Sequence, residues 1–129
     1  MSARALLIED NEANRYLATF LLERHGFQVT HAPDGPSGIA RASREPFDLI
    51  LLDIQLPGMD GYAVAKALRT NLALDAVPII AVTSYAMVGD RERALASGCT
   101  GYIEKPINPD TFVDEIRQHL PVPEARGPG

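Results

Sequence analysis

The chain has 129 residues, 46% hydrophobic and 22% charged, and this composition fits one ordinary globular domain. Its 12 basic and 17 acidic residues give a net charge of −5. Nucleic-acid clamps and binders of anionic membranes need a basic patch, so we expect neither nucleic acid nor a membrane as a partner. Cys99 is the single cysteine, no signal peptide opens the chain, and no apolar run is long enough to span a membrane. We therefore expect a cytoplasmic protein.

Strand and helix patterns alternate from the start of the chain. The apolar run Ala5–Ile8 is too short for a helix and predicts a buried parallel strand. A helical stripe follows, for which Asn11 is a suitable N-cap and Gly26 a suitable stop. The stripe predicts these residues in the core: Ala13, Tyr16, Leu17, Phe20 and Leu21. Phe27–His31 is less apolar and predicts an edge strand, and Pro36–Ser43 predicts a short second helix.

The second half of the chain continues the same alternation. It predicts strands at Leu49–Leu52, Ile79–Val82 and Gly101–Glu104, the last at a sheet edge, and helices at Gly61–Leu72, at Asp90–Ser97 and from Asn108 onward. Asn108 is expected to cap the last helix, with Pro109 in its first position. Five strands alternating with five helices indicate an α/β fold with a doubly wound parallel sheet. Residues 1–120 are expected to form the domain and residues 121–129, rich in proline and glycine, a flexible tail.

Carboxylates follow two of the predicted strands. Glu9 and Asp10 come directly after the first strand, and Asp53 ends the third. Ligands of open parallel sheets bind beyond the carboxyl ends of the strands, where the strand order reverses. If the first and third strands are neighbours, the three carboxylates converge. Two carboxylates about 4 Å apart repel by about 4 kcal/mol at an effective dielectric near 20, so three need a cation. Oxygen ligands of this kind favour Mg²⁺ shared with a phosphate.

Polar and basic groups follow the remaining two strands. Thr83 and Ser84 end the fourth strand, and Lys105 follows the fifth. A hydroxyl donor and a compact ammonium both suit phosphate oxygens. The lysine is informative because the chain has ten arginines and only two lysines.

Four segments together resemble a known family. LLIEDNEANR, DLILLDIQLPGMDGY, PIIAVTSYA and GYIEKPI, in this order, are similar to the receiver domains of two-component response regulators, over about residues 4–120. The resemblance implies the CheY-like (flavodoxin-like) fold, a (βα)5 arrangement with strand order 2-1-3-4-5, which agrees with the expected edge strands.

The resemblance also implies a role for each site residue. Asp53 would be the phosphoacceptor, taking a phosphoryl group from a phosphohistidine on a histidine kinase or phosphotransfer protein. Mg²⁺ would be held by Asp10, Asp53 and the Gln55 backbone carbonyl, and by Glu9 mainly through water. Phosphoryl oxygens would be bound by the Thr83 hydroxyl, Lys105 and the backbone N–H groups of Ile54 and Ser84. Tyr102 would be the switch aromatic that responds to Thr83. The acidic pair is Glu-Asp rather than Asp-Asp, a variation that should leave metal binding intact.

Two further expectations come from the resemblance. The Lys105–Pro106 peptide bond should be cis. Gln55 and Tyr85, each two residues beyond a site residue, should tune hydrolysis of the acyl phosphate more than its formation. The segment Leu56–Gly61 should form a fixed loop beside the metal, which its proline and glycines explain equally well.

The remaining reactive residues carry weaker hypotheses. His25, His31 and His119 are not clustered in the predicted fold, which argues against a histidine metal site. Cys99 follows Gly98 at a helix end and is expected to be a small buried filler.

The favoured interpretation is a stand-alone signalling switch that acts through protein contacts, without turnover catalysis beyond its own phosphorylation and dephosphorylation. Met1 before the first strand and the tail after Leu120 favour a small complete product with no DNA-binding output domain. Alternatives are a phosphorelay carrier or the receiver of a hybrid histidine kinase. A haloacid dehalogenase-type phosphatase would need an aspartate at position 55, where this chain has Gln55, and no dinucleotide or Walker motif follows any strand.

Overall fold

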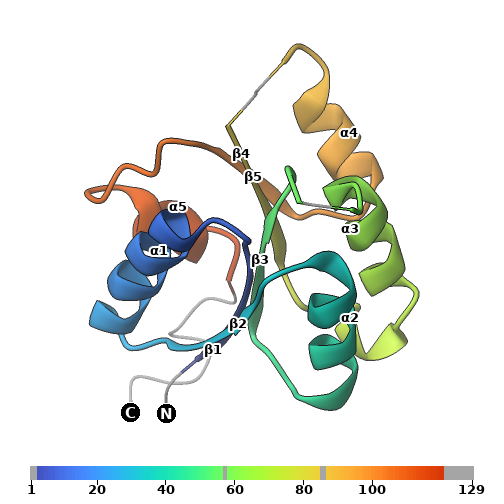
Figure 1. Cartoon of the computed structure of the whole chain (residues 1–129), viewed down its shortest axis with the longest axis horizontal. Helices are drawn as coiled ribbons and strands as arrows, with labels where there is room; N and C mark the ends of the chain where they lie inside the picture. Colours follow the sequence, from blue (N-terminus) through green and yellow to red (C-terminus); the bar gives the residue numbers. More distant parts are fainter. Residues whose placement is uncertain (1–2, 57, 85–86, 121–129) are drawn as a thin grey trace.

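The computed structural model describes residues 3–56, 58–84 and 87–120, which form a five-stranded parallel sheet with helices on both faces (Figure 1). The strands are β1 (Arg4–Ile8), β2 (Gln28–Ala32), β3 (Leu49–Asp53), β4 (Ile79–Thr83) and β5 (Gly101–Glu104). The helices are α1 (Glu12–Arg24), α2 (Gly35–Arg44), α3 (Gly61–Arg69), the 3-10 helix η1 (Leu72–Leu74), α4 (Asp90–Ala96) and α5 (Phe112–Arg117). The predicted alternation and fold class are confirmed. The predicted tail, residues 121–129, lies outside the described residues.

The strand order is β2-β1-β3-β4-β5, as expected. Ile8 pairs with Leu52, and Leu52 pairs with Ala81, so the carboxyl ends of the three central strands lie level with one another. The chain moves from β1 outward to β2 and then crosses back to β3 on the other side of β1. The strand order therefore reverses between β1 and β3, where such sheets bind ligands.

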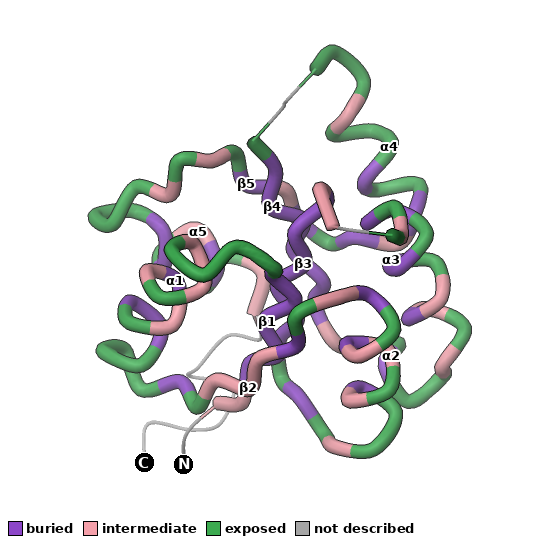
Figure 2. The backbone as a smooth tube through the Cα atoms, viewed as in Figure 1, coloured by how far each residue is buried: buried purple, intermediate pink, exposed green. Residues whose placement is uncertain are grey.

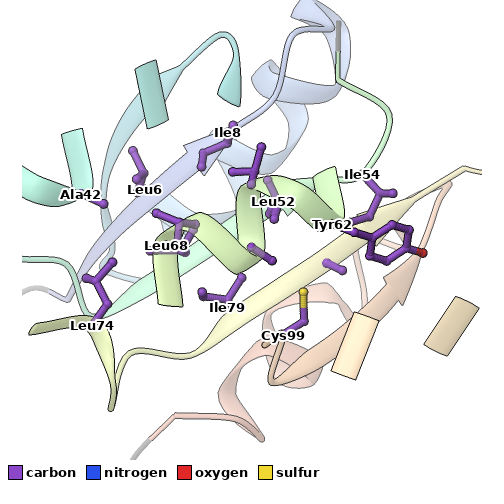
Figure 3. Close-up of a cluster of buried hydrophobic side chains, with 14 of the residues drawn as sticks. Leu6, Ile8, Ala42, Leu52, Ile54, Tyr62, Leu68, Leu74, Ile79 and Cys99 are labelled. Carbon is purple, nitrogen blue, oxygen red and sulfur yellow. The ribbon is translucent and has the colours of Figure 1, made fainter. Parts of the chain in front are cut away.

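Two apolar cores cover the two faces of the sheet. Helices α1 and α5 pack on one face, and α2, α3 and α4 pack on the other (Figure 1). Strands β3 and β4 are buried along their whole length and β1 along all but its first residue, whereas each helix is buried only along its inner side (Figure 2). Figure 3 shows the core beneath α2 to α4, in which the Cys99 thiol lies among the apolar side chains. Cys99 is 4% exposed, and this burial raises its pKa to about 11, as expected for a packed, unreactive thiol.

Helix α1 begins as predicted but buries only part of the predicted stripe. Asn11 Oδ1 accepts a hydrogen bond from the Asn14 N–H at 2.9 Å and so caps the helix. The prediction that Tyr16 and Phe20 lie in the core is wrong, because these side chains are 73% and 45% exposed. Ala13 is exposed as well, whereas Leu21 is buried as predicted and Leu17 packs partly against the core; Ala18 and Leu22 complete the buried side of α1. The two rings stack on each other at the surface, with centroids 6.4 Å apart, and Arg24 lies over Phe20.

Two predicted helix boundaries also need correction. Helix α3 ends at Arg69 rather than Leu72, because the chain turns into η1, and Leu72 is 78% exposed. Helix α5 begins at Phe112 rather than next to Asn108. Asn108 Oδ1 accepts from the Asp110 N–H at 2.9 Å, and this local turn delays the regular helix by one turn. In the part of the chain that the structure describes, no helix is long and apolar enough to cross a bilayer.

Candidate phosphoacceptor and metal site

Three carboxylates meet at the carboxyl edge of the sheet. Glu9 and Asp10 follow β1, and Asp53 is the last residue of β3. One ligand oxygen from each lies within 4.8 Å of the others, which confirms the predicted convergence. Glu9 and Asp53 are each only 4% exposed, whereas Asp10 is exposed to solvent. The group therefore has a buried base and an open mouth.

Lys105 supplies positive charge at the base of this group. Its Nζ lies 3.0 Å from Glu9 Oε1 and 3.4 Å from Asp53 Oδ2, and its side chain is 8% exposed. The Lys105 backbone N–H donates to Thr83 O at 2.7 Å, which fixes the residue beside the end of β4. The Lys105–Pro106 bond is cis, as predicted.

One buried ammonium does not neutralise two buried carboxylates. Burial, and after it the adjacent Glu9, raise the pKa of Asp53 from 3.8 to about 7. Lys105 and the Gln55 backbone N–H act in the opposite direction but do not outweigh these effects. A divalent cation would relieve this repulsion, and three carboxylates with an open side match the oxygen ligands of Mg²⁺. The residues present fit the predicted metal.

The loop after β1 is held by contacts that the sequence did not reveal. The Asn11 N–H donates to Glu9 Oε2 at 3.1 Å. His31 Nε2 lies 2.9 Å from the Glu9 carbonyl oxygen and 3.1 Å from Arg15 Nη1. Alternating polarity in β2 marks His31 as half-buried, but only the pairing of β1 with β2 brings it to Glu9. Among the described residues, no histidine belongs to a group that could hold a metal.

The Gln55 side chain makes two hydrogen bonds that the sequence did not indicate. The amide connects β3 to β4: Nε2 donates to Thr83 Oγ1 at 2.5 Å, and Oε1 accepts from the Ser84 N–H at 3.0 Å. From the sequence, the Gln55 backbone carbonyl is expected to hold Mg²⁺, and Gln55 is expected to tune hydrolysis of the acyl phosphate. No sequence pattern indicates the bridge from its side chain to β4. Tyr85, its predicted partner in tuning hydrolysis, lies outside the described residues.

Two backbone N–H groups follow Asp53 at the end of β3. Ile54 was expected to offer its N–H to a phosphoryl group, but this N–H donates to Val82 O at 3.0 Å in the sheet. The Gln55 N–H instead donates to Asp53 Oδ1 at 2.9 Å. The Ile54 N–H therefore continues the hydrogen bonding of β3 to β4, and the Gln55 N–H is a backbone donor to the Asp53 carboxylate. The role of the Ile54 N–H in binding a phosphoryl group stays a prediction.

The loop between β3 and α3 returns close to the sheet. A Cβ added to Gly61 would lie 2.5 Å from Ile54 Cα, and the Gly61 N–H donates to Ile54 O at 3.2 Å. Gly58 has φ +74°, a conformation that favours glycine. Asp60 Oδ1 caps α3 by accepting from the Tyr62 N–H at 3.0 Å. Both glycines are therefore required by the course of this loop; Pro57 lies outside the described residues.

Tyr102 lies on β5, half-buried against the core under α4. Its hydroxyl is buried and has no hydrogen-bond partner among the described residues, and burial raises its pKa. Arg93 of α4 lies 4.3 Å above the centre of the Tyr62 ring and 3.2 Å from Asp60 Oδ2. This contact ties α4 to the start of α3, and spacing along the chain did not predict it.

The fold and the site together define a doubly wound α/β domain with an acidic, lysine-containing centre at its topological switch point. The family model of the response regulator receiver domain matches residues 5–117, and the chain belongs to this family. It is 39% identical over 120 residues to the polar-differentiation response regulator DivK of Brucella ovis, covering 93% of this chain and 98% of that protein.

Solved receiver structures agree closely with this fold. The chemotaxis response regulator CheY4 of Vibrio cholerae has a TM-score of 0.88 and 29% identity, covering 93% of this chain and all of that one. The receiver domain of a sensor histidine kinase from Pseudomonas aeruginosa PAO1, with a magnesium ion coordinated in its active-site cleft, has a TM-score of 0.84 and 34% identity. That match covers 92% of this chain and 97% of the other. The chain is therefore a response regulator of two-component signalling.

Proposed function

We propose that Asp53 accepts a phosphoryl group from a phosphohistidine on a histidine kinase or a histidine phosphotransfer protein. The observation that carries this proposal is the position of the Asp53 carboxylate, buried at the end of β3 between Glu9 and Lys105. An Asp53 oxygen would attack phosphorus as the bond from phosphorus to the imidazole nitrogen breaks. The imidazole leaves with the electron pair and takes up a proton, and Asp53 becomes an acyl phosphate.

Phosphoryl transfer needs positioning and neutralised charge more than covalent assistance. Mg²⁺, held by Asp10, Asp53 and the Gln55 carbonyl and by Glu9 through water, would supply charge neutralisation to the phosphoryl oxygens. Lys105 would move its ammonium toward the new anion. The Thr83 hydroxyl and the N–H groups of Ile54 and Ser84 would donate to the phosphoryl oxygens, and the Gln55 N–H, which donates to Asp53 Oδ1, would add to this set.

The response would pass from the site to the face formed by α4 and β5. We propose that Thr83 moves toward the phosphoryl group and that Tyr102 adjusts its burial in response. The unpartnered Tyr102 hydroxyl supports this role, because a side chain without a hydrogen bond loses none when it moves. The downstream target would be a protein. Residues 1–120 are proposed as the functional unit, and a cytoplasmic location stays a prediction.

The test is phosphorylation by acetyl phosphate followed by intact-mass analysis. Wild-type protein should gain one phosphoryl group with Mg²⁺ and none with a chelator. Asp53→Asn should gain none, while the control Asp110→Asn, at an exposed aspartate outside the carboxylate group, should behave as wild type. Equal labelling of Asp53→Asn, or labelling that ignores the chelator, would refute the assignment. Initial transfer rates from a panel of phosphorylated kinases would then identify the cognate donor.

A second function, the receiver of a hybrid kinase or a relay carrier, is favoured by the 34% identity to a kinase's receiver domain. The same assay separates the two. A carrier should pass its phosphoryl group on to a histidine phosphotransfer protein within the assay, whereas a terminal regulator should lose it to water.

A further inference from the structure

The Gln55 side chain is hydrogen-bonded to two groups at the end of β4, the Thr83 hydroxyl and the Ser84 N–H, which the proposed function assigns to phosphoryl binding. The Ser84 N–H donates to Gln55 Oε1 at 3.0 Å, and Thr83 Oγ1 accepts from Gln55 Nε2 at 2.5 Å. Thr83 is 1% exposed, and Ser84 lies at the solvent edge of the site. One neutral amide therefore spans the gap between β3 and β4 at the place where a phosphoryl oxygen would have to be bound.

We infer that Gln55 is a positioning residue that holds the phosphoryl cradle in its resting arrangement and competes with the phosphoryl group for Thr83 and Ser84. The inference rests on the proposed function, since the competitor is the phosphoryl group on Asp53. The Ser84 N–H is a single donor, so donating it to a phosphoryl oxygen requires loss of its bond to Gln55 Oε1.

The phosphoryl group is the stronger competitor, but the hydrogen bonds of Gln55 still oppose its binding. A hydrogen bond to an anionic oxygen is roughly twice as strong as one to a neutral amide oxygen. Phosphorylation can therefore displace the amide, but the displaced bonds oppose it. The same bonds hold the start of the loop after Thr83 against β3, so the resting conformation persists until the phosphoryl group is present.

Gln55→Met tests this inference, because methionine keeps the length of the side chain and removes both hydrogen bonds. Gln28 is the exposed first residue of β2, at the end of the strand away from the site. It supplies the matched control Gln28→Met. The metal ligand expected from position 55 is its backbone carbonyl, which the substitution retains. The Mg²⁺ affinity of each variant is measured first, so that all later comparisons are made at saturating Mg²⁺.

Two readouts distinguish a positioning role from a structural one. Amide hydrogen exchange at Ser84, followed by NMR without metal or phosphate analogue, should be about two- to tenfold faster in Gln55→Met than in wild type, the range that corresponds to one net hydrogen bond. Beryllofluoride with saturating Mg²⁺ should bind Gln55→Met about two- to tenfold more tightly, because the competing amide is gone. Gln28→Met should match wild type in both.

Unchanged exchange at Ser84 or unchanged beryllofluoride affinity in Gln55→Met overturns the inference. Weaker beryllofluoride binding at saturating Mg²⁺ also overturns it, since Gln55 would then assist the phosphorylated state. If wild-type protein does not bind beryllofluoride, the proposed function is wrong and the competition falls with it. The exchange rate of Ser84 still reports in that case whether the resting hydrogen bond exists, so the two failures are distinguishable.

Discussion

Lys105 pairs more closely with Glu9 than with the proposed phosphoacceptor, the distance from Nζ to Glu9 Oε1 being 3.0 Å. In the resting protein the ammonium is therefore shared within the acidic group. A phosphoryl group on Asp53 would compete with Glu9 for this lysine. A bound metal ion would neutralise the charge of Glu9 and so weaken its ion pair with Lys105. The balance of charge at the site is thus set by one lysine and two buried carboxylates, which leads to the first two predictions.

Replacing Lys105 with Gln should destabilise the metal-free protein at pH 8 by about 3 kcal/mol, because two buried carboxylates lose an ammonium that contacts both. Most of the loss should be recovered with saturating Mg²⁺. Urea unfolding with and without chelator measures both effects. Lys66→Gln, the exposed second lysine on α3, is the control and should change stability by less than about 0.5 kcal/mol. An equal loss with Mg²⁺ present would contradict the electrostatic explanation.

The metal-free protein should lose stability as pH rises, through Asp53. Because its folded pKa of about 7 lies above the unfolded value of 3.8, the folded state binds more protons than the unfolded state between these values. Stability contributed by this group therefore falls between about pH 4 and pH 7. Relative to Asp53→Asn, wild type should lose about 1–3 kcal/mol between pH 5 and pH 8 in chelator, measured by urea unfolding. A difference between the two proteins that does not depend on pH would exclude the raised pKa.

The close approach of the β3–α3 loop predicts a strong effect at Gly61. Gly61→Ala should destabilise by about 2–4 kcal/mol and weaken Mg²⁺ binding, because its Cβ would overlap the Ile54 backbone, which cannot move aside as a side chain could. Gly58→Ala meets no atom within 4 Å and pays only for its positive φ, about 1–2 kcal/mol. Thermal unfolding and calorimetric Mg²⁺ titration test this order, and the reverse order would contradict it.

Removing the Tyr102 hydroxyl should not destabilise the resting protein. Tyr102→Phe eliminates a buried hydroxyl with no partner among the described residues and should stabilise by about 0.5–1 kcal/mol. Tyr16→Phe, at an exposed ring, is the control and should be neutral within error. A loss of more than about 1 kcal/mol in Tyr102→Phe by urea unfolding would indicate a hydrogen bond that this account lacks.

The sheet and the base of the site were predictable because strands buried on both faces leave uninterrupted apolar runs. The polar residues that must follow such runs then mark the ligand edge: Glu9, Asp53, Thr83 and Lys105. The inner face of α1 was not predictable in the same way. Tyr16 and Phe20 have the spacing of a buried helical stripe. At the surface, however, the two rings are stabilised by stacking on each other and by the contact of Arg24 with Phe20, so their spacing does not show that they are buried.

Contacts between strands were the part that local patterns could not supply. The hydrogen bond from the Ile54 N–H to Val82 O depends on the pairing of β3 with β4, and the Gln55 bridge depends on the same pairing. His31 reaches Glu9 only through the pairing of β1 with β2. Such relationships join residues far apart in the chain, so they follow from the register of the sheet and not from any one segment.

The ion pair between Glu9 and Lys105 spans 96 residues of sequence and joins the first strand to the segment after the last. During synthesis, the chain therefore emerges with its carboxylates first and their counter-charge last. A nascent or truncated chain that ends before Lys105 has the acidic group without the ammonium that balances it. The charge balance of the site is therefore complete only on a chain whose synthesis has passed β5.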